Sequence, residues 1–346
     1  MSEAVKQFSN KVGLPRIIIS AFFIFLFLVA LILKLPIASL MSDSIRRFGM
    51  YGVLVLAMVP AIQSGIGPNF ALPLGIICGL LGGLMSIEFG FVGAKGFWGA
   101  IIISLPFAAI VGWIYGMLLN KIKGSEMLVA TYTGFSIVSF MSIMWILLPF
   151  NHPEMVWPIG NGLRVTIALD STFGQILNNF LSKSILGVNI PTGLLLFFFS
   201  CCFLVWLFSR SKLGIAMKAA GDSPKFALAS GINVDQCRIV GTVLSTVLGA
   251  VGILVYAQSY GFIQLYQAPL MMAFPAVASV LIGGASATRA KISHVILGAF
   301  LFQGLLTVAL PVANEIVSEG NLSEVLRMIV QNGIILYALT KVGGEE

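Results

Sequence analysis

The stretch SRSKLGIAMKAAGDSPKFALASGINVDQCR, residues 209–238, is the polar segment around which the rest of the chain can be interpreted. It stands between two long apolar runs and carries five of the twenty Lys and Arg residues. Loops rich in Lys and Arg lie on the cytoplasmic side of membrane proteins, so we expect this segment in the cytoplasm.

The same segment has the signals of two short helices joined by a Gly-Asp-Ser-Pro hinge. Asp222 or Ser223 can cap a second helix that has Pro224 in its first turn, and Gly231 is a natural helix end. A structured polar segment of this kind favours a docking site for a partner, whereas composition alone also permits an ordinary solvated linker.

Two groups of small residues resemble one family of transport proteins. The first group is Gly214-Ile215-Ala216, Ala219-Ala220-Gly221-Asp222-Ser223-Pro224, Ala227, Ala229 and Gly231-Ile232-Asn233-Val234, and the second is Leu281-Ile282-Gly283-Gly284-Ala285-Ser286. The first resembles the coupling loop of ABC importer permeases of the ribose, simple-sugar, nucleoside and branched-chain amino-acid type, and the second resembles that family's Gly-Gly-Thr-Ser stretch. The resemblance covers most of the second half of the chain, and the first half matches weakly.

The resemblance implies partners and a set of coupling residues. In this family the loop contacts a cytoplasmic ABC ATPase, which carries the ATP and Mg, and the permease pairs with a second permease subunit, identical or related. An extracytoplasmic solute-binding protein delivers the solute. The ATPase-coupling residues implied here are Gly214, Ala219, Ala220, Gly221, Asp222, Pro224, Ala227, Gly231 and Ile232.

Composition places the chain in the membrane before any motif is considered. The 346 residues are 58% hydrophobic and 10% charged, whereas a soluble surface needs roughly 25% charged residues. The apolar runs are long enough for helices that cross a lipid core, and barrel strands would be shorter and alternating. We therefore expect an all-α integral membrane protein surrounded by lipid, and the net charge of +7 is a topology signal that does not indicate nucleic acid.

Ten apolar runs form one transmembrane permease domain over residues 1–346. They lie near residues 17–34, 47–63, 71–88, 97–119, 127–148, 191–208, 238–257, 269–285, 292–312 and 326–340. With an internal N-terminus, thirteen of the twenty Lys and Arg residues fall on the cytoplasmic side. The sequence thus predicts a multi-pass protein of the cell membrane with both termini in the cytoplasm, and a retained first helix in place of a signal peptide.

The order of the runs permits an inverted repeat of helices 2–5 and 7–10, the arrangement used for alternating access. The runs contain almost no ionisable residue: Glu88 stands at the end of one and Glu126 before another. Carriers coupled to protons or sodium commonly place carboxylates inside the membrane, so energy from a partner is favoured.

Residues 64–73, SGIGPNFALP, cannot continue a helix because they contain two glycines and two prolines. Such a break lies against protein or a water-lined cavity and is typical of a substrate path, although a plain cytoplasmic turn is equally compatible. Asn69 is the candidate path residue here. The family usually has a Gly-Ile-Asp-Leu-Ser-like motif near this place, and this sequence lacks the Asp.

Glycines spaced by four residues predict close helix contacts. Gly75, Gly79 and Gly83 form one stripe, and Gly112 with Gly116 forms a second. These are features of helix packing, and they fit a transporter whose helices move against each other.

Two external segments are expected. Residues 149–190 form an extracytoplasmic loop in which apolar residues at helical spacing from Phe173 to Leu181 predict an amphipathic helix, either a dock for a solute-binding protein or a lid on the bundle. The second segment begins at Gln258 and carries no charge. Its Gln258, Tyr260 and Gln264 suit a neutral, hydroxyl-bearing solute because amides and phenols donate and accept hydrogen bonds.

No cofactor or metal site is expected in this chain. The four cysteines lie in or beside apolar runs, and the two histidines, His152 and His294, are too isolated for zinc. The sequence has no phosphate-binding loop and no catalytic constellation.

The residues and the resemblance together therefore predict the permease subunit of an importer driven by a separate ATPase, and the resemblance implies a small neutral solute, a sugar or a nucleoside. The alternative is a secondary carrier or channel that works alone, for which uptake would follow an ion gradient. A membrane-embedded enzyme is the least favoured class.

Overall fold

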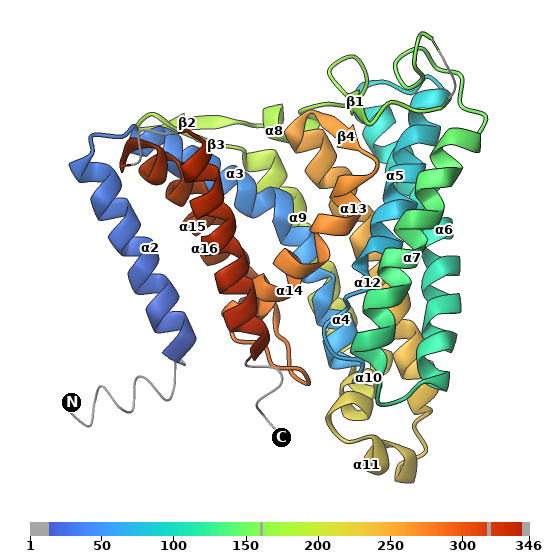
Figure 1. The fold of residues 1–346 in the computed structure, drawn as a ribbon. Coiled ribbons are helices and arrows are strands. Elements are labelled where there is room, and N and C mark those ends of the chain that lie inside the picture. Colours follow the sequence, from blue (N-terminus) through green and yellow to red (C-terminus); the bar gives the residue numbers. More distant parts are fainter. Residues whose placement is uncertain (1–13, 160–161, 317–319, 341–346) are drawn as a thin grey trace, which may run out of the picture.

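Each of the ten apolar runs forms helix in the computed structural model, which describes residues 14–159, 162–316 and 320–340. The elements are arranged as a bundle of long helices (Figure 1). The helices are α2 Leu14–Ile32, α3 Ile37–Leu56, α4 Met58–Gln63, α5 Leu72–Glu88, α6 Gly93–Lys121, α7 Glu126–Leu147, α8 Ile176–Asn179, α9 Thr192–Arg210, α10 Lys212–Asp222, α11 Pro224–Ala229, α12 Val234–Tyr260, α13 Gln267–Met271, α14 Ala273–Ile282, α15 Ile292–Ile316 and α16 Gly320–Thr340.

Six helical segments in the described part of the chain are long and apolar enough to cross a membrane. They are Ile37–Gln63, Gly93–Lys121, Glu126–Leu147, Thr192–Arg210, Val234–Tyr260 and Ile292–Ile316. Shorter apolar helices occupy the remaining runs. The all-α membrane class is confirmed, and the count of ten spans and the inverted repeat stay predictions.

In the part of the chain that the structure describes, strands are few and short. The strand β1 Thr166–Ala168 pairs antiparallel with β4 Phe262–Gln264, and β2 Lys183–Ile185 pairs antiparallel with β3 Val188–Ile190. All four lie at one end of the bundle, which we call the β end (Figure 1). They tie the loop between α7 and α9 to those ends of α3 and α12 that lie at the β end.

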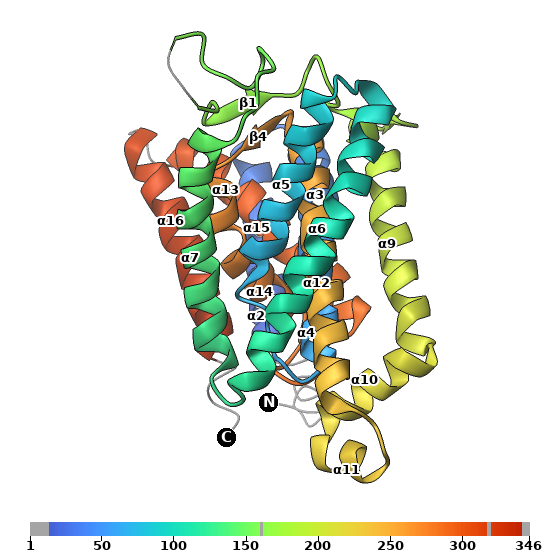
Figure 2. The same ribbon diagram turned by 90° about the vertical axis from the view of Figure 1, so that its right-hand side faces the viewer.

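The opposite end, which we call the α10 end, carries α10 and α11 (Figures 1 and 2). The start of α2, the turn between α6 and α7 and the end of α16 lie at the same end. Segments expected in the cytoplasm are thus placed together. The terminal residues 1–13 and 341–346 lie outside the described residues, and which end faces the cytoplasm stays a prediction.

The helix α12 is the centre of the bundle and contacts α3, α5 and α6. Glycines make these contacts close: a Cβ atom on Gly79 would run into the carbonyl oxygen of Ala250 in α12. A Cβ atom on Gly112 would lie 2.9 Å from the Cα atom of Val243. The predicted close approach of the glycine-bearing helices is confirmed.

The second helix starts earlier than its apolar run indicates. The run begins at residue 47, whereas α3 begins at Ile37 and includes both Arg46 and Arg47. Arg46 is near Asp43, at 3.8 Å, and both side chains are almost half exposed. A helix end that reaches water tolerates charged side chains. Hydropathy alone therefore places the start of this helix too late in the sequence.

The predicted amphipathic helix around residues 173–181 is wrong in extent, because α8 contains only residues 176–179. Gln175, just before α8, has a left-handed backbone with φ of 58°, and Phe180, just after it, is extended, so the helix ends on both sides. Phe173 is fully buried before it. The apolar residues therefore anchor a turn to the bundle and do not form one continuous face.

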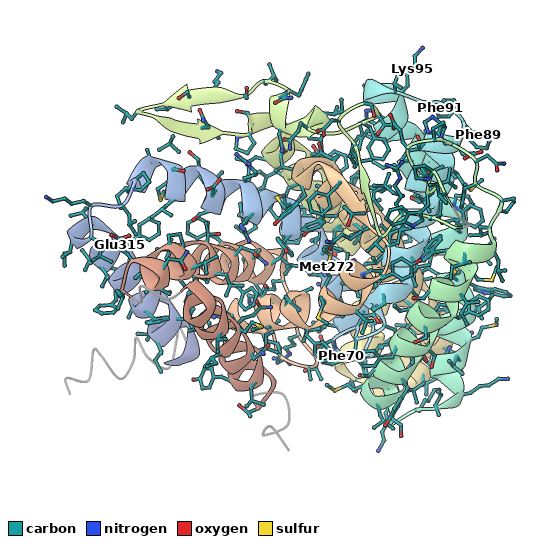
Figure 3. All side chains as sticks on the ribbon, turned by 45° about the horizontal axis from the view of Figure 1, so that its top comes forward. Phe70, Phe89, Phe91, Lys95, Met272 and Glu315 are labelled. Carbon is teal, nitrogen blue, oxygen red and sulfur yellow. The ribbon has the colours of Figure 1, made fainter. Side chains whose placement is uncertain are left out.

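The turn between α5 and α6 is also at the β end. Phe89 and Phe91 lie with ring centroids 5.9 Å apart, and Figure 3 shows them beside Lys95. Both rings are exposed, at 58% and 41%. The turn therefore presents two apolar rings beside the basic Lys95 at this end of the bundle.

Candidate functional site

The segment 209–238 forms the two predicted helices, α10 and α11, with Ser223 between them. The Ser211 hydroxyl accepts a hydrogen bond of 3.2 Å from the Gly214 N–H and so caps α10. Ser223 occupies the cap position of α11 without a side-chain bond. Gly231 has φ of 79°, as expected for a glycine that follows a helix end.

Most small residues of this segment pack against other parts of the same chain. Ala220 and Ala227 are almost fully buried and pack in one apolar cluster with Met217, Val234 and Cys237. The implied coupling residues divide by exposure: Gly214, Ala220 and Ala227 are buried, Ala219, Gly221 and Ile232 are half-buried, and Asp222, Pro224 and Gly231 are exposed. The buried members shape the segment, and the exposed ones can reach another protein.

Gly221, near the end of α10, packs on the end of α4. A Cβ atom on Gly221 would run into the carbonyl oxygen of Gln63 and would lie 2.9 Å from the backbone nitrogen of Gly65. The two-helix segment thus touches the break between α4 and α5 through backbone atoms. A side chain at Gly221 cannot be accommodated unless one of these parts moves.

Large apolar side chains face outward on either side of the buried Ala227. Phe226 is 66% exposed and Leu228 is 62% exposed, and both belong to α11. Pro224 and Lys225 are exposed beside them. The sequence analysis did not single out Phe226 or Leu228. The sequence feature that points to them is a pair of large apolar residues on either side of a small one, within a short polar segment.

Residues 64–71 break the helix as predicted, and the break is buried in protein. Gly65 and Gly67 have φ of 79° and 89°. Asn69 is 2% exposed, and its Nδ2 donates a hydrogen bond of 2.8 Å to the Ser245 hydroxyl in α12. Its Oδ1 accepts from the Ala71 N–H at 3.0 Å. Asn69 therefore holds the broken backbone to the central helix.

Aromatic rings lie beside this break. The ring of Phe70 lies 5.6 Å from that of Phe274 in α14, measured between centroids. Figure 3, tilted to bring the β end forward, labels Phe70 together with Met272, which stands between α13 and α14. Both are nearly buried, at 6% exposure. The break thus contacts α14 as well as α12.

Gln258 does not line an open surface. It is fully buried in α12, and its Oε1 accepts a hydrogen bond of 3.0 Å from the Leu177 N–H at the start of α8. Its Nε2 donates to the Val255 carbonyl at 3.2 Å. Gln258 thus fastens the loop at the β end to the bundle.

The four candidate path residues do not form one site. Gln264 belongs to β4, where it lies opposite Thr166. Tyr260 is 42% exposed at the end of α12. Asn69 bonds to Ser245, which precedes Tyr260 by about four helical turns, or about 22 Å along the axis.

Tyr260 belongs instead to a series of four aromatic rings. Centroids are 5.2 Å apart for Tyr51 and Tyr256, 5.3 Å for Tyr256 and Tyr260, and 4.8 Å for Tyr260 and Phe262. The series runs from the half-buried Tyr51 in α3 to Phe262 in β4 at the β end. Sequence reasoning missed it, although the spacing of four between Tyr256 and Tyr260 places both on one face of a helix.

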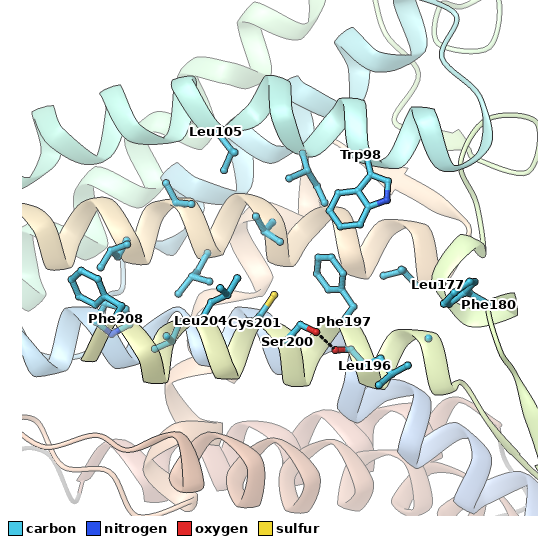
Figure 4. A pocket seen from close by; sticks show the side chains of 18 residues that line it. Trp98, Leu105, Leu177, Phe180, Leu196, Phe197, Ser200, Cys201, Leu204 and Phe208 are labelled. Atoms are coloured by element: carbon cyan, nitrogen blue, oxygen red, sulfur yellow. Dashed lines mark hydrogen bonds between the residues drawn. The ribbon is translucent and has the colours of Figure 1, made fainter. Parts of the chain in front are cut away.

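An apolar groove of about 550 Å³ separates α9 from α6 and α12 (Figure 4). Trp98, Leu105 and Phe197 are among its lining residues. The Ser200 hydroxyl on its wall donates to the Leu196 carbonyl at 2.7 Å and so offers no free donor. The groove suits apolar chains and does not suit a polar solute.

Among the described residues, no three His, Cys, Asp or Glu side chains are grouped so that they could hold a metal ion. The four cysteines are free and buried.

A family model described as the permease component of the branched-chain amino acid transport system matches residues 40–339. The chain belongs to this permease family. The match covers the helices from α3 to α16, so it includes both the break and the two-helix segment. The predicted resemblance to ABC importer permeases is confirmed at the level of the family, and the protein is a multi-pass membrane permease component.

Relatives of this permease are named for different substrates. The nucleoside ABC transporter permease protein NupB of Lactococcus lactis subsp. cremoris is 23% identical over 226 residues, which is 62% of this chain and 58% of that protein. A tyrosine transport system permease protein of Clostridioides difficile is 27% identical over 175 residues, or 49% of this chain and 54% of that protein. The chain thus spans about half the length of these relatives.

Proposed function

We propose that this chain is the transmembrane permease subunit of an ATP-binding-cassette importer, with a separate ATPase seated on α10 and α11. The observation that carries this proposal is the pair of exposed apolar side chains, Phe226 and Leu228, on a helix that is otherwise held to the bundle through the buried Ala227. Exposed apolar residues at a polar end of a membrane protein favour contact with another protein.

A contact there would act on the membrane-embedded part through Gly221. Because Gly221 packs on Gln63 and Gly65 without an intervening side chain, a displacement of α10 displaces the break or opens a gap beside it. The partners that follow are the ATPase with its ATP and Mg, a second permease subunit, and an extracytoplasmic solute-binding protein that docks at the β end.

For the solute we propose a nucleoside. The aromatic series Tyr51, Tyr256, Tyr260 and Phe262 contains one exposed ring, that of Tyr260, and planar bases stack on exposed aromatic rings. The solutes named for the relatives, nucleosides and tyrosine, both carry an aromatic ring. A sugar has no aromatic ring, so it would gain less from contact with the aromatic series.

The experiment replaces Phe226 with Asp and measures two things: co-purification of the ATPase with the permease, and ATP-driven uptake of labelled uridine. Leu186→Asp is the matched control, because Leu186 is 96% exposed at the β end. We expect Phe226→Asp to lose both the ATPase and the uptake, and Leu186→Asp to keep the ATPase. If Phe226→Asp kept both the bound ATPase and the uptake, the proposed binding of the ATPase to α11 would be refuted.

A further inference from the structure

Arg238 was expected in the polar segment as a topology signal, yet it lies in the second turn of α12 and is 7% exposed. Its Nη2 forms an ion pair of 2.6 Å with Glu126 Oε1 at the start of α7. Its Nε donates to the Asn120 Oδ1 at 3.0 Å. The charge expected in water is therefore enclosed by protein.

The same guanidinium reaches two backbone carbonyls. Nη1 donates to the carbonyl oxygen of Gly65 at 3.4 Å, and Nη2 donates to that of Leu119 at 3.4 Å. Gly65 is in the break, whereas Leu119 and Asn120 lie in the last turn of α6. One side chain thus joins the break to the ends of α6 and α7 and to the central helix.

The turn of α12 that carries Arg238 is also the turn on which α10 and α11 rest. Val234 and Cys237 pack in the apolar cluster that contains Met217 and Ala227. A pocket of about 740 Å³ lies between these helices and the break, and Arg238 is among its lining residues. The space leaves room for the segment and the break to change their relative positions.

A neighbouring ion pair shows what an ordinary charge contact looks like at this end. Lys123 and Asp235 are 2.6 Å apart, but their side chains are 54% and 55% exposed. An exposed pair contributes little to stability, whereas removing one partner of a buried pair leaves a charge without compensation. Arg238 and Glu126, at 9% and 16% side-chain exposure, belong to the second kind.

We propose that Arg238 is a positioning residue. It holds the break, residues 64–71, in its packed position at the α10 end of the bundle. Movement of α10 and α11 shifts the first turns of α12 and separates Arg238 from the Gly65 carbonyl, which frees the break. The assignment rests on the proposed function, because the movement is supplied by the ATPase. The contacts by which Arg238 holds the break lie within this chain and need no partner.

The test compares Arg238→Gln with Lys123→Gln in the full-length chain. Lys123→Gln removes a cation of the exposed pair at the same end and is the matched control. Hydrogen exchange of the amides of residues 64–71 is measured in the permease in nanodiscs, and uridine uptake per ATP hydrolysed is measured in the reconstituted complex. Arg238→Lys, which keeps the charge but loses the planar fork, is the conservative variant.

We expect Arg238→Gln to speed exchange in residues 64–71 by roughly ten-fold or more and to lower uptake per ATP, because a buried partner is left unpaired. Lys123→Gln should change neither quantity by more than about two-fold. Arg238→Lys should give an exchange rate and an uptake per ATP between those of the other two variants. If Arg238→Gln does not fold, Arg238→Lys is compared with the control instead, and faster exchange in residues 64–71 is again required.

Equal exchange in the variant and the control would overturn the assignment, and so would faster exchange with an unchanged ratio of uptake to ATP. If the wild-type complex shows no ATP-driven uptake, the proposed function fails. The exchange measurement then decides alone whether Arg238 holds the break, since it needs no partner.

Discussion

Gly221 in α10 and Gly65 in the break touch backbone to backbone: a Cβ atom added to Gly65 would lie 3.0 Å from the Cα atom of Gly221. One glycine belongs to the polar segment that links α9 to α12, and the other lies between α4 and α5. The contact joins the part of the chain that can meet a partner to the part that interrupts a membrane helix. It is the structural basis of the proposed coupling.

Replacing Gly221 with Ala should weaken this contact. The added methyl group meets the Gln63 carbonyl oxygen, and overpacking of this kind costs about 1–3 kcal/mol. We expect a lower thermal midpoint and reduced ATP-driven uptake. Gly333→Ala is the control, because nothing lies within 4 Å of a Cβ atom there. If both variants behaved like the wild type, the contact would have no role.

Gln258 should act on stability at the β end. Gln258→Leu leaves the Leu177 N–H without its acceptor inside the protein, which costs about 1–3 kcal/mol. We expect a lower thermal midpoint and less folded protein. Gln264→Leu, on the half-buried β4 strand, should cost less. A normal midpoint for Gln258→Leu together with a specific loss of transport would return Gln258 to the solute path.

Tyr260 should affect selectivity if ring stacking guides the solute. Tyr260→Phe keeps the ring, and Tyr260→Ala removes the member that links Tyr256 to Phe262. Stacking of a base on an aromatic ring is worth about 1–3 kcal/mol, so uridine uptake should fall roughly five- to hundred-fold in the Ala variant. Initial rates for uridine and ribose check this. An equal fall for both solutes would argue against stacking.

The orientation can be tested with two added cysteines. Leu186 is 96% exposed at the β end, and Lys225 is exposed at the α10 end. The four native cysteines are buried, so their background labelling should be low. In intact cells an impermeant thiol reagent should label Leu186→Cys, and it should label Lys225→Cys only after permeabilisation. The reverse pattern would invert the predicted topology.

Much of the fold could be predicted because membrane helices are long and apolar. The ten runs, a break that begins at residue 64 and the two short helices after α9 follow from hydropathy and from the positions of Gly and Pro, although the break ends at residue 71 and not at the predicted residue 73. The start of α3 could not be predicted in this way, since its first turns carry Asp43 and Arg46 at an exposed helix end.

The sites were harder to predict because burial of polar groups depends on tertiary contacts. Gln258 and Arg238 stand at the two ends of α12, where hydropathy indicates water. Both are buried because a distant segment folds over them: the loop containing Leu177 in one case, and the end of α6 with Glu126 in the other. Small residues such as Gly221 were recognised as important, but only the structure shows that they face this chain.

The source of energy is the central question, and uptake in proteoliposomes answers it most directly. The permease is reconstituted with its ATPase and its solute-binding protein, ATP is supplied on the side of α10 and α11, and labelled uridine is followed with and without ionophores. We predict uptake that requires ATP and persists when ion gradients are collapsed. Uptake that continues without ATP and stops with the ionophores would contradict the account and identify a secondary carrier.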